Sequence, residues 1–267
     1  MNTGSREAAI NARNALVGGG SAGIGYAAAE QLLRSGHRVV ITGRRAEQLE
    51  SAALRLAANT GGLVHPLVND VSEPKSAEAA VAEAESRFGS LDVLVLNAGG
   101  PPPGRILDVD DERWQQAFDL LLLGPLRLAR LALPRMAAQR YGRVVFITST
   151  AVRQPQPDLA TSVVIRSAVT AAAKLLSQEF AAEGVTVNCV APGATATERR
   201  REILEARARR TGTAFEDLDA ADAANIPIGR AGAPEEIGAA VAFLASAAAG
   251  YINGTVLTVD GGRTETI

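Results

Sequence analysis

Hydrophobic residues along the chain form short runs rich in Val, Ile and Leu that alternate with longer Ala- and Leu-rich runs of helical period. The short runs predict strands at residues 15–17, 38–42, 63–68, 91–96, 143–148, 185–190 and 255–259. The longer runs predict helices at residues 24–35, 46–59, 74–88, 111–139, 161–182 and 234–246. Strands such as 91–96 lack polar alternation, which indicates burial on both faces and therefore a parallel sheet covered by helices. The pattern predicts an α/β fold, a single doubly wound, Rossmann-like domain with a mostly parallel seven-stranded sheet.

The domain is expected to span residues 13–267, after a polar tail at residues 1–12. Between Gly193 and Pro234 the periodic pattern weakens into a charged helical segment and an Ala- and Asp-rich loop. Long insertions inside a compact domain are often functional. Residues 194–230, called the lid segment below, are therefore a candidate lid over a substrate.

Composition narrows the class of protein. With 267 residues, 47% hydrophobic content and a net charge of -2, the chain can bury a large core, and its charge argues against nucleic-acid binding. The single cysteine, Cys189, lies in an apolar run, which excludes an internal disulfide and favours a reducing, cytoplasmic compartment. No apolar stretch reaches the roughly 18 residues that cross a bilayer, and the start of the chain lacks a signal-peptide pattern. Neither membrane association nor a metal site is predicted.

A glycine-rich segment joins the first predicted strand to the first predicted helix. It places Gly19, Ser21, Gly23, Ile24 and Gly25 where a phosphate-binding turn would lie. Glycines allow a sharp turn and a close approach to a pyrophosphate, whose charge is favoured by the free amides at the helix start. The alternative is tight-turn chemistry without a ligand, which the position between a strand and a helix disfavours.

The end of the second predicted strand distinguishes between cofactors. An acidic residue at Gly43 would hold a ribose 2′-hydroxyl and repel a 2′-phosphate, whereas the chain has no acid there and continues with Arg44 and Arg45. We therefore predict NADP(H), with Arg44 pairing with the 2′-phosphate. The alternative is that both arginines face water at the start of the next helix, and this fits Arg45 better than Arg44.

Residues 143–180 comprise a buried strand, a Pro-rich loop and a long helix that carry Ser149, Ser162 and Arg166. This stretch resembles the short-chain dehydrogenase/reductase family, in which a serine follows the strand and a Tyr-x-x-x-Lys pair lies on the helix. The register is fixed where the family's Ala, Lys, Leu and Glu match Ala168, Lys174, Leu176 and Glu179. It puts Ser162 at the tyrosine position and Arg166 at the lysine position.

The resemblance covers nearly the whole chain after about residue 13 and extends to 3-oxoacyl-acyl-carrier-protein reductases. In the glycine turn, Gly18 replaces the family's usual threonine. Further residues beside the cofactor are implied at Asp70, Val71, Asn97, Ala98, Gly99, Pro192, Gly193 and Thr195. The resemblance also implies a homo-oligomer, a tetramer or a dimer, in which the helices at 111–139 and 161–182 pair across a dimer and the last strand makes a tetramer contact.

In the family, an asparagine, a serine, a tyrosine and a lysine form a proton relay, and this chain matches only the serine, at Ser149. Leu121 stands at the asparagine position. Leucine cannot order a relay water, serine has a far higher pKa than a phenol, and arginine stays charged, so every change affects proton transfer. Arg166 can still donate to the ribose hydroxyls of the cofactor. Ser149 can donate to a substrate oxygen, or it can satisfy backbone groups at the strand end.

No other residue is placed to supply the missing acid. The tyrosines lie elsewhere in the chain, the histidines are expected to be structural or solvated, and Asp158, after a proline, is best explained as a turn residue. The arginines between residues 199 and 210 favour a solvated face of a lid helix, with attraction of a carboxylate or a phosphopantetheine-borne substrate as the alternative.

We expect an atypical NADPH-dependent oxidoreductase that transfers hydride to an activated small molecule such as a carbonyl, enone, quinone or imine. The catalytic candidates are Ser149, Ser162 and Arg166. The alternatives are a cofactor-binding pseudo-enzyme or regulatory subunit, and non-redox chemistry in the same cleft.

Overall fold

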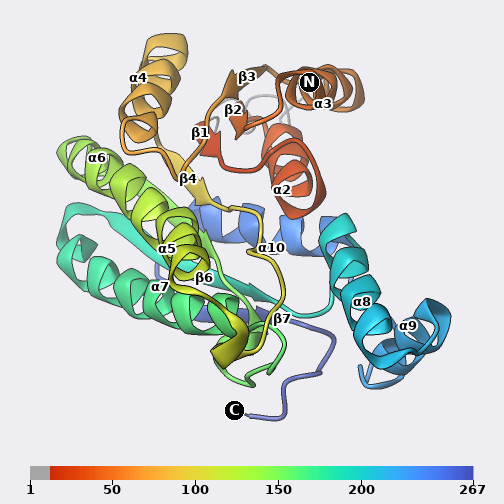
Figure 1. Ribbon diagram of the computed structural model, residues 1–267. Coiled ribbons are helices and arrows are strands. Elements are labelled where there is room, and N and C mark those ends of the chain that lie inside the picture. The colour runs from red at the N-terminus through yellow and green to blue at the C-terminus, as the bar shows by residue number, and fades with distance from the viewer. Residues whose placement is uncertain (1–12, 267) are drawn as a thin grey trace.

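The computed structural model describes residues 13–266, in which seven parallel strands form one sheet in the order β3-β2-β1-β4-β5-β6-β7 (Figure 1). Their bounds are β1 Asn14–Val17, β2 Arg38–Gly43, β3 Val64–Val68, β4 Val93–Leu96, β5 Gly142–Ile147, β6 Val185–Pro192 and β7 Val256–Val259. The predicted fold class is confirmed, and the sheet is parallel throughout. The polar tail predicted at residues 1–12 lies outside the described residues.

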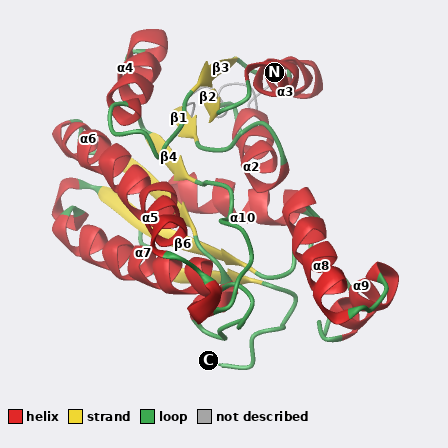
Figure 2. Cartoon of the chain, viewed as in Figure 1, coloured by secondary structure: helices red, strands yellow, loops and turns green. Residues whose placement is uncertain are grey.

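Helices cover both faces of the sheet, as Figure 2 shows in red around the yellow strands. One face packs against α2 (Gly23–Arg34), α3 (Ala46–Thr60) and α10 (Pro234–Ala245). The other packs against α4 (Ser76–Phe88), α6 (Gly124–Ala138) and α7 (Ala160–Glu179). Neighbouring residues of one strand alternate between the two cores: Val17 packs in the first and Leu16 in the second. Burial on both faces explains why the strand sequences lack polar alternation.

The sheet reverses its order at β1, which pairs with β2 on one side and β4 on the other. In doubly wound sheets, ligands bind at the carboxyl ends of the strands beside such a reversal. The loops after β1, β4 and β5 therefore border the expected cleft. Short 3-10 helices also lie in the loops between these elements, at Ile106–Asp108, Thr150–Val152, Ala181–Glu183 and Ala247–Ala249.

The helix predicted at residues 111–139 is not continuous. It divides into α5 (Asp111–Phe118), a π-helical turn at Asp119–Leu123 and α6. The backbone N–H of Gly124 donates to the carbonyl of Asp119, five residues earlier. Pro125 follows and has no N–H to offer the carbonyl four residues before it, so the α-helical ladder cannot run through this point.

The lid segment holds two helices, α8 (Glu198–Thr211) and α9 (Phe215–Ala224), which project beyond the carboxyl end of the sheet in Figure 1. The prediction of an Ala- and Asp-rich loop is wrong where α9 forms, because alanine favours helix and the acidic first turn of α9 suits the helix dipole. Thr195 and Gly232 form a β-bridge that closes the base of the segment. Within residues 13–266, no helix is long and apolar enough to cross a membrane.

Candidate active site

The glycine turn after β1 is tightly packed against its neighbours. A Cβ added to Gly25 would lie 2.2 Å from the carbonyl oxygen of Gly19, and one added to Gly20 would lie 2.6 Å from Cβ of Ile41. Gly19 has a φ of +62°, in the left-handed region that favours glycine. Nδ2 of Asn97 donates to the carbonyl of Gly18 at 3.0 Å and holds the turn against the end of β4. Glycines are therefore required here because the turn packs at backbone distance against Ile41 of β2 and Asn97 after β4.

The glycine turn also meets the end of β2. Oγ of Ser21 lies 3.6 Å from the position that a Cβ on Gly43 would take. Arg44 and Arg45 follow, and both are exposed. α2 begins beside them with no side-chain cap and no acidic residue in its first turn. This corner thus combines free helix-start amides with nearby cations, an arrangement suited to an anion.

The predicted residues after β3 and β4 have structural roles in the same region. Oδ1 of Asp70 accepts hydrogen bonds from the backbone N–H and the hydroxyl of Ser72, at 3.0 and 2.7 Å, which fixes the turn before α4. The carbonyl of Val71 would lie 2.2 Å from a Cβ on Gly124, so α6 packs closely on this turn. Ala98 packs against Leu121 and its neighbours, and Gly99 faces open space.

The end of β6 completes this edge of the cleft. A Cβ on Gly193 would lie 2.5 Å from Cβ of Asp260, so the backbone after Pro192 passes close to the last strand. Thr195 is buried, and its hydroxyl donates to the carbonyl of Gly193 at 3.2 Å. The hydroxyl of Thr150 donates to the carbonyl of Pro192 at 3.4 Å. This contact joins the β6 end to the turn that begins after Ser149.

Ser162 and Arg166 of α7 meet the end of β5, close along the chain to Ser149. Nη1 of Arg166 donates to the carbonyl of Ile147 at 2.5 Å, two residues before Ser149, and its Nε donates to Oγ of Ser162 at 3.2 Å. Oγ of Ser149 accepts from the backbone N–H of Ala151 at 3.1 Å, so it does satisfy a backbone group. Because both serine oxygens act as acceptors, each hydroxyl hydrogen remains to be donated elsewhere.

Two arginines give this part of the cleft its charge. Burial, with a further contribution from the nearby charge of Arg199, lowers the pKa of Arg166 to about 10, which leaves it positive at neutral pH. Burial likewise lowers the pKa of Arg199, whose Nη2 donates to the carbonyl of Pro101. Arg200 is also partly buried and pairs with Asp219 and Asp222 of α9. The prediction of a solvated face is therefore wrong for these two arginines of α8.

Leu121 is buried in a small apolar cluster at the π-helical turn. Its buried partners are Ala117 and Ile165, and Ala98, Trp114 and two further leucines pack around them. Ile165 precedes Arg166 on α7, so apolar side chains occupy the side of α7 next to the candidate catalytic residues. The Leu121 side chain itself offers no hydrogen-bonding group that could hold a water at the asparagine position.

Asp158 has a role that the sequence did not reveal. Its Oδ2 accepts from Nη2 of Arg210 at 2.7 Å and lies 3.5 Å from Nε of Arg207, both on α8. The hydrogen bond from Arg210 lowers the pKa of Asp158 below its usual value. Its backbone carbonyl also accepts from Gly104. Asp158 is thus a link between the loop before α7 and the lid segment as well as a loop residue.

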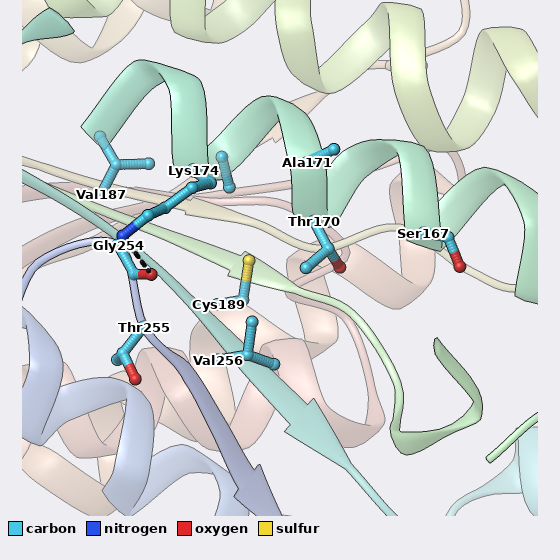
Figure 3. A pocket seen from close by; sticks show the side chains of 10 residues that line it. Ser167, Thr170, Ala171, Lys174, Val187, Cys189, Gly254, Thr255 and Val256 are labelled. Carbon is cyan, nitrogen blue, oxygen red and sulfur yellow. Dashed lines mark hydrogen bonds between the residues drawn. The ribbon is translucent and has the colours of Figure 1, made fainter. Parts of the chain in front are cut away.

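A pocket of about 340 Å³ lies on a different side of α7, against β6 and the start of β7. Figure 3 shows the Lys174 side chain reaching from α7 to the backbone of Gly254, where its Nζ donates to the carbonyl at 3.4 Å, with Cys189 close by. None of the lining residues belongs to the predicted site. Lys174 is engaged there and does not stand in for a lysine beside Ser162.

Comparisons with known proteins show which family the chain resembles. A family model described as enoyl-(acyl carrier protein) reductase matches residues 19–264. The chain is 34% identical over 248 residues to the 3-oxoacyl-[acyl-carrier-protein] reductase FabG of Escherichia coli, covering 93% of this chain and 96% of that protein.

Solved structures give the same result. The L-sorbose reductase of Gluconobacter frateurii, in complex with NADPH and L-sorbose, superposes with a TM-score of 0.90 at 31% identity, covering 96% of this chain and 98% of that one. YwfH, an NADPH-dependent reductase involved in bacilysin biosynthesis, superposes with a TM-score of 0.90 at 30% identity, covering 96% and 100%. The chain therefore belongs to the short-chain dehydrogenase/reductase family.

Proposed function

We propose that the protein is an NADPH-dependent reductase that transfers hydride to an activated small molecule without a catalytic tyrosine. The observation that carries the proposal is that one chain contains both parts such a reductase needs. One is the tight glycine turn beside the end of β2, where Arg44 lies, and the other is the chemical end, defined as Ser149, Ser162 and Arg166 at the end of β5 and on α7. The similarity to an L-sorbose reductase described in complex with NADPH, and to YwfH, described as NADPH-dependent, supports the same cofactor.

The residues present fit NADP(H). The glycine turn leaves no room for side chains on its packed side, which suits a backbone that must approach a pyrophosphate, and the start of α2 offers amides to it. Arg44 is exposed at the end of β2, where it would hold the 2′-phosphate. Arg166, Pro192, Gly193 and Thr195 would hold the nicotinamide riboside. Bound NADPH supplies the hydride.

The residues of the chemical end can stabilise the negative charge that develops on a substrate oxygen. The hydroxyl of Ser149 would donate to that oxygen, and so would the hydroxyl of Ser162, whose own oxygen is held by Nε of Arg166. The Arg166 cation makes the Ser162 hydroxyl a stronger donor. A serine hydroxyl does not ionise readily at neutral pH, so the proton that completes the reduction comes ultimately from water.

This arrangement suits substrates that need little help at the oxygen. Removing a positioned general acid costs about 10²- to 10⁴-fold in rate. A quinone, an enone or an iminium accepts hydride more readily than an unactivated ketone, so the loss matters less for these substrates.

The test is a binding measurement followed by a substrate screen. The Kd of NADPH and of NADH is measured by nucleotide fluorescence, and NADPH oxidation is then followed with matched ketones, enones, quinones and imines. We expect NADPH to bind more tightly than NADH and activated acceptors to be reduced faster than ketones. Tight NADPH binding with no oxidation by any acceptor class would support the pseudo-enzyme instead, and failure to bind either nucleotide would support non-redox chemistry.

A further inference from the structure

The partners of the arginines on α8 set Arg199 apart. Arg200 pairs with two aspartates of α9, Arg201 with Glu205 at 2.9 Å, and Arg210 with Asp158 at 2.7 Å. Within residues 13–266, Arg199 pairs only with Glu202, at 3.3 Å, and the Glu202 side chain is 56% exposed. Ion pairs with a solvated carboxylate contribute little, so the charge of Arg199 is poorly compensated.

Arg199 contacts the loop that follows β4. Its Nη2 donates to the carbonyl of Pro101, and its Nε lies 2.7 Å from the position of a Cβ on Gly100. Gly100 and Pro101 follow Gly99 in the segment that leaves the end of β4. Arg199 thus reaches from the lid segment onto the loop that borders the candidate active site.

Arg166 is a second cation that pairs with no carboxylate among residues 13–266. Arg166 makes its hydrogen bonds to neutral oxygens, those of Ser162 and Ile147. Among residues 13–266, the charged group that influences Arg166 is Arg199, and this influence is repulsive. In the part of the chain that the structure describes, neither arginine pairs with a buried acid. Partly buried cations of this kind cost free energy, and a bound anion would recover part of it.

We propose that Arg199, which reaches from α8 onto the loop after β4, binds a substrate that carries a carboxylate by pairing with that group. The proposal rests on the proposed function, because it places the carboxylate next to the group that Ser149 and Ser162 would reduce. It assigns the substrate class to oxo acids and their conjugated analogues.

The competing anion is a phosphate of the cofactor. The start of α8 does approach the glycine turn, but through Thr197, whose Cγ2 lies 3.3 Å from the position of a Cβ on Gly23. Arg199 lies two residues further along and contacts the loop after β4, within electrostatic reach of Arg166. This position favours the substrate over the pyrophosphate.

The experiment measures ligand binding and needs no turnover. Oxo acids with one to four carbons between carbonyl and carboxylate, each paired with its methyl ester, are titrated by calorimetry into the protein saturated with NADP⁺. We expect at least one acid to bind about tenfold or more tighter than its ester, as a charge-assisted hydrogen bond implies. Arg199→Ala should abolish this preference and leave the Kd of NADPH within about twofold, because a residue facing the substrate adds little to cofactor binding.

Arg201→Ala is the matched control, since Arg201 lies on the same helix with an exposed side chain. It should keep the preference for the acid. The proposal is overturned if no acid binds tighter than its ester, if Arg199→Ala keeps the preference, or if that variant weakens NADPH binding as much as acid binding. The proposed function has a separate test: it fails if none of the acceptors causes the protein to oxidise NADPH.

Discussion

The double substitution Ser162→Tyr with Arg166→Lys tests whether proton transfer is the step that this site lacks. Ser162 is 9% exposed and its Oγ meets Nε of Arg166, so a tyrosine there would sit beside the residue at position 166. A lysine at 166 gives up the paired hydrogen bonds of arginine but can lower the pKa of the phenol and exchange protons. A positioned general acid contributes about 10²- to 10⁴-fold.

The structure favours the lower end of that range. Leu121 stays in its apolar cluster, so a water relay behind the lysine is not restored. Adding Leu121→Asn is not useful, because Leu121 is 4% exposed and a buried amide without a partner costs about 1–3 kcal/mol. We therefore expect kcat/KM for an unactivated ketone to rise about 10²-fold in the double variant.

The assay is NADPH oxidation at saturating cofactor with a simple ketone, alongside the Kd of NADPH. Ser162→Phe with Arg166→Lys is the matched control, because phenylalanine fills the same space without a hydroxyl and should give no increase. If the tyrosine variant binds NADPH normally and reduces the ketone no faster than the phenylalanine variant, the reasoning about the missing relay is refuted.

Three further predictions concern the cofactor, the lid segment and the core. Arg44→Ala should weaken NADPH binding about 10- to 100-fold and leave NADH binding unchanged, with Arg45→Ala as the control; equal losses for both nucleotides would contradict the 2′-phosphate assignment. Asp158→Asn should speed amide hydrogen exchange in α8 at neutral pH, because it weakens the pair with Arg210. The pKa of Asp158 is lowered in the folded protein. In the unsubstituted protein the ion pair should therefore be fully formed above the ordinary carboxyl pKa and be lost only as the pH falls through the lowered pKa of Asp158. If exchange in α8 depends neither on the substitution nor on pH in this way, Asp158 does not link the two segments. Burial raises the pKa of Cys189 to about 12, so at pH 8 the native thiol should react with iodoacetamide at least about 10²-fold more slowly than in urea, and equal rates would contradict its burial.

The sheet could be predicted from the sequence because each buried strand is a short run of adjacent apolar residues. The π-helical turn was missed, although Gly124 and Pro125 carry its signal. The hydrophobic period averaged over residues 111–139 hardly changes when one helical turn contains an extra residue. The local hydrogen bonding does change, because a proline has no N–H to continue the α-helical pattern. The helix boundary there depends on one missing donor.

The ion pairs of the lid segment could not be predicted in the same way. Along the sequence, the acids among the α8 arginines favour a solvated helix face, and this fits Arg201, which is mostly exposed and pairs with Glu205. Arg200 instead pairs with Asp219 and Asp222 across two helices, and Arg210 with an aspartate far earlier in the chain. Such partners are selected by tertiary packing, so the burial of Arg199 and its approach to Pro101 became visible only in the structure.

The geometry at Arg166 gives a reason for arginine at this position beside a serine. Its planar guanidinium donates to Ser162 through Nε and to the carbonyl of Ile147 through Nη1 at the same time. The single ammonium of lysine cannot reproduce this fork, and a tyrosine at 162 would displace the Nε contact. Ser162 and Arg166 therefore form a matched pair, and Arg166→Lys alone should weaken NADPH binding without any gain in ketone reduction. The effects of the two substitutions should be strongly non-additive, because each alone leaves its partner without the hydrogen bond that holds it.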